Sequence, residues 1–290
     1  MLISRTPAAL RHRWEQWKEQ RRAAAWVRKG RVPGGPGYNA AKWSSIEQAL
    51  AGVTGQPYGY DDAGLDERVV EYPWAFARLA KLHTRGARLL DAGSVLNHRS
   101  LLAHCRRTGH CPLSIVTLRY EGFAEVSDDV RYEFADLRTL PYRDDWFALV
   151  VSLSTLEHVG MDNAIYGDKT GAGPDPTLAL ISAMHELRRV TMPRGTALVS
   201  VPFGIRSNRG WLRIFDEGDL DGVTRSSGWR LEQTRFFRAT RDGWREGSMD
   251  DARDAGYNEP RDPLLAGVAR TAPEWVAAAE AVALVELTKV

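Results

Sequence analysis

The sequence has little cysteine and no long apolar stretch. Cys105 and Cys111 are the only cysteines among 290 residues, which is too few for a disulfide framework and consistent with a reducing compartment. No apolar run approaches the roughly 20 residues that a membrane-spanning helix needs. Hydrophobic residues make up 43% and charged residues 26% of the chain, close to the average of folded globular proteins. The composition argues against a disordered chain and a membrane-spanning protein, and the length suits one main domain.

The first residues also lack the apolar segment of a secretory signal peptide, because Arg5, Arg11 and Arg13 interrupt it. We therefore expect a cytoplasmic protein.

The net charge of +2 is unevenly distributed. Residues 1–31 contain nine Lys or Arg residues and two Glu residues, a charge of +7, which leaves −5 for the rest of the chain. The basic segment is thus an appendage and does not reflect the general character of the protein.

Within the basic segment, Leu10, Trp14 and Trp17 recur at helical spacing among Lys and Arg residues. We favour a solvated helix whose tryptophans pack on their own domain. Two alternatives are peripheral contact with an anionic membrane through residues 7–29 and nonspecific attraction to nucleic-acid phosphate. Gly and Pro residues between 30 and 37 mark a linker. We divide the chain into a basic helical appendage with its linker, residues 1–62, and a main domain, residues 63–290.

Along the main domain, strand-like apolar patterns alternate with helical ones, which is typical of α/β proteins. Helices are expected at residues 69–82, interrupted near Pro73, and at 100–107 and 178–190. A parallel sheet delivers ligand-binding groups to its carboxyl edge, so the strand ends are the places to search for a site. Strands are expected at residues 87–90, 113–118, 130–134, 147–153, 197–201, 229–237 and 281–288.

Two strand ends carry motifs of known type. The first is Leu-Leu-Asp-Ala-Gly-Ser at residues 89–94, and the second combines Leu-Pro at 140–141, Phe147 and Leu-Glu-His-Val at 156–159. In order and separation they resemble class I S-adenosylmethionine (SAM) methyltransferases, from about Glu67 to the C-terminus. The runs at 67–74 and 208–216 resemble members associated with surface-glycan biosynthesis clusters. The resemblance implies SAM as cofactor and a doubly wound, Rossmann-like, mostly parallel sheet of seven strands, with one antiparallel edge strand.

The resemblance also implies a cofactor site. Asp91, Gly93 and Ser94 would form its first loop, where a glycine permits close approach of backbone to ligand. The family usually has a second glycine at the position of Val95. The acid that usually follows the second strand and binds the ribose is missing, and Glu121 is the nearest carboxylate.

Residues after the third and fourth strands complete this implied site. Asp136 would accept a hydrogen bond from the adenine amino group, Leu137 would contact the ring, and Ser154 would border the cofactor. The unperturbed pKa of a histidine is near neutrality, so His158 is the expected general base for a hydroxyl acceptor. The alternative is that the pair at 157–158 only orders the next helix and flanks the cofactor.

Four residues after the fifth strand are candidates for the substrate side. Aromatic faces suit sugar rings, and Arg can pair with a carboxylate or phosphate. The alternative for the tryptophan is a core position. The candidates are Phe203, Arg206, Asn208 and Trp211.

No bound metal is expected. Asp162 and Asp168 suit a solvated loop better than a Mg²⁺ site, and the His-Cys pairs at 104–105 and 110–111 lie away from the expected ligand edge. The predicted function is methyl transfer from SAM to a hydroxyl of a small-molecule or glycan-linked acceptor, without a specific nucleic-acid partner. The alternative is a catalytically silent member of the fold that serves as a partner-binding or membrane-associated scaffold, which Val95 and the missing acid favour.

Overall fold

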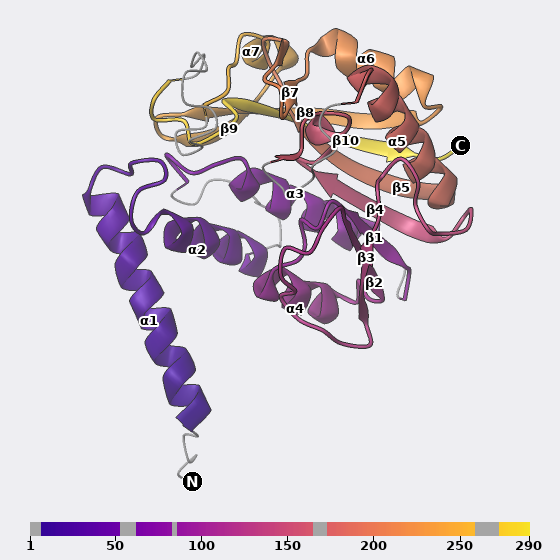
Figure 1. Ribbon diagram of the computed structural model, residues 1–290. Helices are drawn as coiled ribbons and strands as arrows, with labels where there is room; N and C mark the ends of the chain where they lie inside the picture. The colour runs from indigo at the N-terminus through magenta and orange to yellow at the C-terminus, as the bar shows by residue number, and fades with distance from the viewer. Residues whose placement is uncertain (1–6, 53–61, 83–85, 165–172, 259–272) are drawn as a thin grey trace.

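The computed structural model describes residues 7–52, 62–82, 86–164, 173–258 and 273–290, with side chains from residue 14 onward. An eight-stranded sheet in the order β3-β2-β1-β4-β5-β10-β8-β9 lies at its centre (Figure 1). This confirms the expected α/β class with a mostly parallel, Rossmann-like sheet. The strands are β1 (Leu89–Ala92), β2 (Leu113–Thr117), β3 (Val130–Phe134), β4 (Phe147–Leu153), β5 (Thr191–Pro202), β8 (Arg230–Thr240), β9 (Gly243–Gly247) and β10 (Ala281–Thr288).

The antiparallel strands of the sheet differ from the expectation of one antiparallel edge strand. β10 is antiparallel to both β5 and β8, so it lies inside the sheet and not at its edge. Its first seven residues are all buried, as a continuous apolar run requires of a strand with neighbours on both sides. The antiparallel edge is β9, which forms a hairpin with β8. This hairpin raises the number of strands to eight, one more than expected.

Helices cover both faces of the sheet. Leu89 of β1 belongs to the apolar core shared with α2 (Tyr38–Ala51), α3 (Arg68–Lys81) and α4 (Arg99–Thr108). Leu90, the next residue, belongs to the core shared with α5 (Pro176–Val190) and α6 (Glu217–Ser226). This alternation with period two is what a strand between two helical layers produces. The remaining short elements are η1 (Leu156–His158), β6 (Ser207–Asn208), β7 (Arg213–Ile214) and α7 (Met249–Ala252).

Helix α3 continues through Pro73 without the expected interruption. A proline inside a helix removes one backbone hydrogen bond and costs about 3 kcal/mol. The cost is offset because α3 is buried on most sides, with Val70 fully buried and Trp74 and Phe76 each 1% exposed. Burying a large apolar side chain stabilises by about 1.5–3 kcal/mol, so packing overrides the local preference of the sequence.

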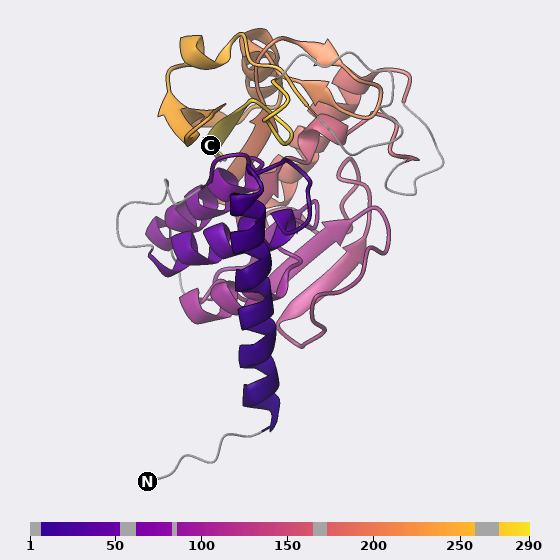
Figure 2. The same cartoon turned by 90° about the vertical axis from the view of Figure 1, so that its left-hand side faces the viewer.

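The N-terminal helix α1 (Pro7–Arg28) extends away from the rest of the molecule, while its C-terminal end packs against α2 (Figures 1 and 2). Trp26 is 1% exposed and joins the core, but Trp14 and Trp17 are 54% and 50% exposed. The favoured expectation that Trp14 and Trp17 pack on their own domain is therefore wrong.

None of the described helices combines the length and apolar character that crossing a bilayer requires. The division at residue 62 stays a prediction, although α2 shares its core with β1.

Candidate active site

A cavity of about 810 Å³ opens at the carboxyl edge of β1, β2, β3 and β4. This is the edge at which open parallel sheets bind ligands. The loops that follow these strands approach one another because the strands run side by side in the same direction. Of the residues expected to bind cofactor or to act in catalysis, the cavity is lined by Gly93, Ser94, Glu121, Asp136, Leu137, Ser154 and His158.

Asp91 lies behind the first loop and does not line the cavity. It is fully buried, and its carboxyl oxygens accept the backbone N–H groups of Val95 at 3.1 Å and Leu96 at 2.7 Å. Burial raises the pKa of Asp91 to about 7, although these two hydrogen bonds lower it. Asp91 therefore holds the backbone of the first loop in place. The expectation that it contacts a cofactor directly is not met, and its role is to position the loop.

Gly93 and Ser94 form the part of the loop that faces the cavity. Gly93 has a φ of 129°, and a Cβ at this position would lie 2.8 Å from Thr155 Cβ and closer still to the rest of that side chain. Both the dihedral angle and the close approach of the β4 loop therefore require glycine. Ser94 follows with a φ of 60°, and its buried Oγ has no hydrogen-bond partner among the described residues. A buried hydroxyl without a partner is costly.

The residues after β2 and β3 line a second side of the cavity. Asp136 accepts hydrogen bonds from the backbone N–H of Arg138 at 2.8 Å and from its guanidinium at 2.6 Å. Burial raises the pKa of Asp136, but the bonds to Arg138 outweigh it and hold this pKa below its usual value. Leu137 is buried beside it, whereas Glu121 lies exposed on the loop after β2. Asp136 is thus a charged acceptor held in a fixed orientation.

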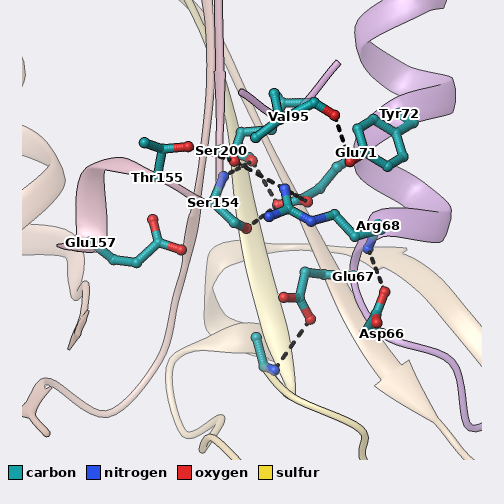
Figure 3. Close-up of polar contacts among 12 residues, drawn as sticks. Asp66, Glu67, Arg68, Glu71, Tyr72, Val95, Ser154, Thr155, Glu157 and Ser200 are labelled. Atoms are coloured by element: carbon teal, nitrogen blue, oxygen red, sulfur yellow. Dashed lines mark hydrogen bonds and ion pairs between the residues drawn. The ribbon is translucent and has the colours of Figure 1, made fainter. Parts of the chain in front are cut away.

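A buried polar network ties α3 to the end of β4 and to β5 (Figure 3). Glu71 is fully buried and accepts hydrogen bonds from Ser154 Oγ at 2.5 Å and from Ser200 Oγ at 2.6 Å. Its second oxygen pairs with Arg68 Nη1 at 3.0 Å, and the same nitrogen donates to Leu153 O at 2.9 Å. The network fixes the backbone at Ser154, where β4 reaches the cavity.

Two further buried acids flank this network in Figure 3. Burial, followed by the charges of Asp66 and Glu71, raises the pKa of Glu67 to about 8. Burial also raises the pKa of Glu157 well above its usual value. Glu67 therefore holds its proton near neutral pH, and Glu71 is the acid that pairs with Arg68.

His158 lies at the end of η1 and lines the cavity. Its Nδ1 is 2.9 Å from the carbonyl oxygen of Trp211, and its ring stacks on the Trp211 ring with centroids 5.1 Å apart. Burial lowers the pKa of His158 to about 4, although the bond to Trp211 raises it. The ring is therefore neutral, and Nδ1 donates to the carbonyl, which leaves the acceptor lone pair on Nε2.

The aromatic residues expected on the substrate side belong to the core instead. Phe203 is 1% exposed and contacts Phe236, with ring centroids 4.8 Å apart. Trp211 is 8% exposed and lies against His158, outside the cavity lining. The alternative of a core position for Trp211 is therefore the correct one.

The polar residues expected on the substrate side lie near the surface and do not line the cavity. Arg206 pairs with Asp219 at 3.0 Å, and its side chain is mostly exposed. Asn208 is in the β6–β7 hairpin, where its Oδ1 accepts the N–H of Gly210. The chain after β5 forms this hairpin, and neither side chain is part of the cavity lining.

A wall of the cavity that sequence reasoning missed comes from α2 and α3. The ring of Trp43 stacks on His98 with centroids 3.3 Å apart and on Tyr72 with centroids 6.0 Å apart. Tyr72 OH donates to Val95 O at 2.8 Å, which ties the wall to the first loop. All three rings line the cavity. Sequence reasoning assigned Trp43 only to the appendage and linker, residues 1–62, and no motif marks it as a cavity residue.

The described residues contain no cluster of three or more His, Cys, Asp or Glu side chains placed to hold a metal ion. Asp162 is exposed, and its Oδ1 accepts the N–H of Ala164. Asp168 lies outside the described residues.

No protein-family model and no curated protein sequence matches this chain. Among solved structures, it is similar to the [4+2]-cyclase SpnF, with 18% identity over 89% of this chain and 98% of that one and a TM-score of 0.49. A putative sarcosine dimethylglycine methyltransferase from Galdieria sulphuraria has 15% identity over 85% and 98%, with a TM-score of 0.49. The 1,6-didemethyltoxoflavin-N1-methyltransferase of Burkholderia thailandensis, solved with S-adenosylhomocysteine, has 16% identity over 71% and 72%, with a TM-score of 0.41. Identities and scores this low carry no inference about activity or ligand.

Proposed function

We propose that this protein is a SAM-dependent methyltransferase that acts on a hydroxyl group of a small-molecule or glycan-linked acceptor. One observation carries the proposal, the convergence of Gly93, Asp136 and His158 from the ends of three parallel strands on a single cavity. Its volume of about 810 Å³ is in the range of cofactor and ligand sites, which leaves room for a cofactor and a small acceptor.

The cavity lining fits the chemistry of SAM. Asp136 offers a charged acceptor for an adenine amino group, Leu137 an apolar contact for the ring, and Glu121 a carboxylate for the ribose hydroxyls. SAM would contribute a methyl group on a positively charged sulfur.

The residues at the end of β4 would serve the acceptor. Alignment and exclusion of water account for much of the acceleration in a displacement of this kind. His158 is neutral, and its Nε2 could take the proton of the acceptor hydroxyl as the C–O bond would form, the methyl–sulfur bond would break and a neutral thioether would leave. Its low pKa makes it a weak base, which suffices because the attacking oxygen becomes acidic as it is methylated. The bond from Nδ1 to Trp211 O holds the required tautomer.

One observation favours the catalytically silent scaffold as a second candidate. Val95 is 9% exposed and lines the cavity at the position where the resembling family has glycine. If its side chain fills the space that the cofactor needs, the cavity would not bind SAM.

Asp136→Asn tests the proposed site, with Asp128→Asn as a matched control, since Asp128 is an exposed acid on the β2–β3 loop outside the cavity. We expect Asp136→Asn to weaken the binding of S-adenosylhomocysteine about tenfold or more, because a hydrogen bond to a charged group contributes about 1.5–3 kcal/mol. Asp128→Asn should bind as the wild type does. Equal affinities for both variants would mean that the cofactor site is misplaced.

A further inference from the structure

The C-terminal half of α1 is held firmly on the molecule. Trp26 donates from Nε1 to Val32 O at 2.7 Å, and Ala23 and Val27 pack against the same core. The N-terminal half continues the same helix away from the sheet and its covering helices (Figures 1 and 2). Because the helix is continuous, this half is presented in a fixed direction.

The side of α1 that faces away from the core combines aromatic rings with positive charge. At about 100° per residue, the positions 14, 17, 18, 21 and 28 are centred on the side opposite the core-facing residues Ala23, Trp26 and Val27. Trp14 and Trp17 are 54% and 50% exposed there. Lys18 Nζ lies 3.3 Å above the Trp14 ring, and the Arg21 guanidinium lies 4.7 Å from the Trp17 ring.

Negative charge is absent from this stripe. The acids of α1 are Glu15 and Glu19, and by the same helical geometry both fall on the flank nearest Trp26. Glu19 is also paired with Arg22 at 2.5 Å. The stripe of Trp14, Trp17, Lys18, Arg21 and Arg28, in which Lys18 is half-buried and the others are exposed, therefore contains only cationic and aromatic side chains.

We infer that this stripe docks the protein on the surface of an anionic phospholipid membrane. Tryptophan is enriched at the level of the lipid headgroups, where its apolar ring and its N–H are both accommodated. Lys and Arg beside the rings are attracted by the negative surface potential of such a membrane. Because the rings and the charges lie on the same side of α1, both kinds of side chain can reach the lipid headgroups together. The inference does not depend on the proposed catalytic function.

Sedimentation of the full chain with lipid vesicles tests this inference. One set of vesicles contains phosphatidylcholine alone, and the other an equal mixture with phosphatidylglycerol. We expect the chain to sediment with the mixed vesicles only, and high salt to release it, because charges at a surface are screened by salt.

Two double variants and their controls identify the docking face. The variant Lys18→Gln with Arg21→Gln should bind mixed vesicles about 30-fold more weakly, since each basic residue near the surface contributes about 1 kcal/mol. Arg225→Gln with Arg253→Gln removes the same charge from other exposed positions and should have little effect. Trp14→Ala with Trp17→Ala should weaken binding at least about tenfold. Phe134→Ala, at a position as exposed as Trp14, should not.

Several outcomes would overturn the inference. These are a lack of vesicle binding, equal binding to both kinds of vesicle, and unchanged binding by the α1 variants. Stronger binding to a single-stranded oligonucleotide that the α1 variants abolish would assign the stripe to nucleic acid. Concentration-dependent self-association in analytical ultracentrifugation, lost in Trp14→Ala with Trp17→Ala, would assign it to a second copy of the chain.

Discussion

Glu71→Gln removes the negative charge that balances Arg68 and leaves the size of the side chain almost unchanged. Glu71 is fully buried and accepts three hydrogen bonds, from Arg68, Ser154 and Ser200. Glutamine has a single acceptor oxygen, and its amide nitrogen is a donor that would meet another donor. Removing one partner of a buried ion pair costs about 3–5 kcal/mol. Because the Arg68 side chain is 24% exposed, we expect the lower end, about 3 kcal/mol.

Urea unfolding at neutral pH, followed by circular dichroism, measures this loss. The matched control is Glu246→Gln, which breaks an ion pair with Arg235 in which the glutamate side chain is 46% exposed. A surface pair contributes about 0–1 kcal/mol, so the control should be nearly as stable as the wild type. Adding Arg68→Met to Glu71→Gln should recover part of the loss, because no uncompensated charge then remains. The reasoning is refuted if Glu71→Gln costs no more than Glu246→Gln.

Gly93→Ala should destabilise the protein by about 3 kcal/mol or more, because it adds a collision with Thr155 to backbone strain. Gly86→Ala, also at positive φ but in open space, should cost only about 1–2 kcal/mol in the same unfolding assay. Burial raises the pKa of Glu67 from 4.5 to about 8. Between these two pH values the folded chain keeps a proton that the unfolded chain has lost. The contribution of Glu67 to the free energy of unfolding therefore falls as the pH rises toward and through 8. Between pH 7 and pH 9 the wild type should lose about 1.4 kcal/mol that Glu67→Gln retains, and parallel losses in both proteins would contradict the assignment.

The sequence was sufficient to predict at which edge of the sheet the cavity lies, because strands and their ends are marked by short stretches of sequence. Parallel strands with continuous apolar residues are predictable from composition, and their carboxyl ends must share one edge of the sheet. Gly93, Asp136 and His158 follow such strands, and all three line the cavity. The β8–β9 hairpin could also have been predicted, since Asp-Gly at 242–243 is typical of hairpin turns.

The features that sequence reasoning missed depend on contacts between distant parts of the chain. Glu71 lies 83 residues from Ser154 and 129 from Ser200, so no spacing pattern marks the network. The aromatic residues after β5 suggested a sugar site, but Phe203 and Trp211 are buried in the core. Whether an aromatic residue faces a cavity or the core is decided by tertiary packing.

Calorimetric titration of the wild-type chain with SAM, and separately with S-adenosylhomocysteine, tests the central proposal most directly. We predict one saturable site with micromolar affinity for either ligand, because the lining offers Asp136, Leu137 and Glu121 to an adenosyl group. No heat of binding for either ligand at millimolar concentration would contradict this proposal and favour the catalytically silent scaffold, with Val95 occupying the space that the cofactor needs.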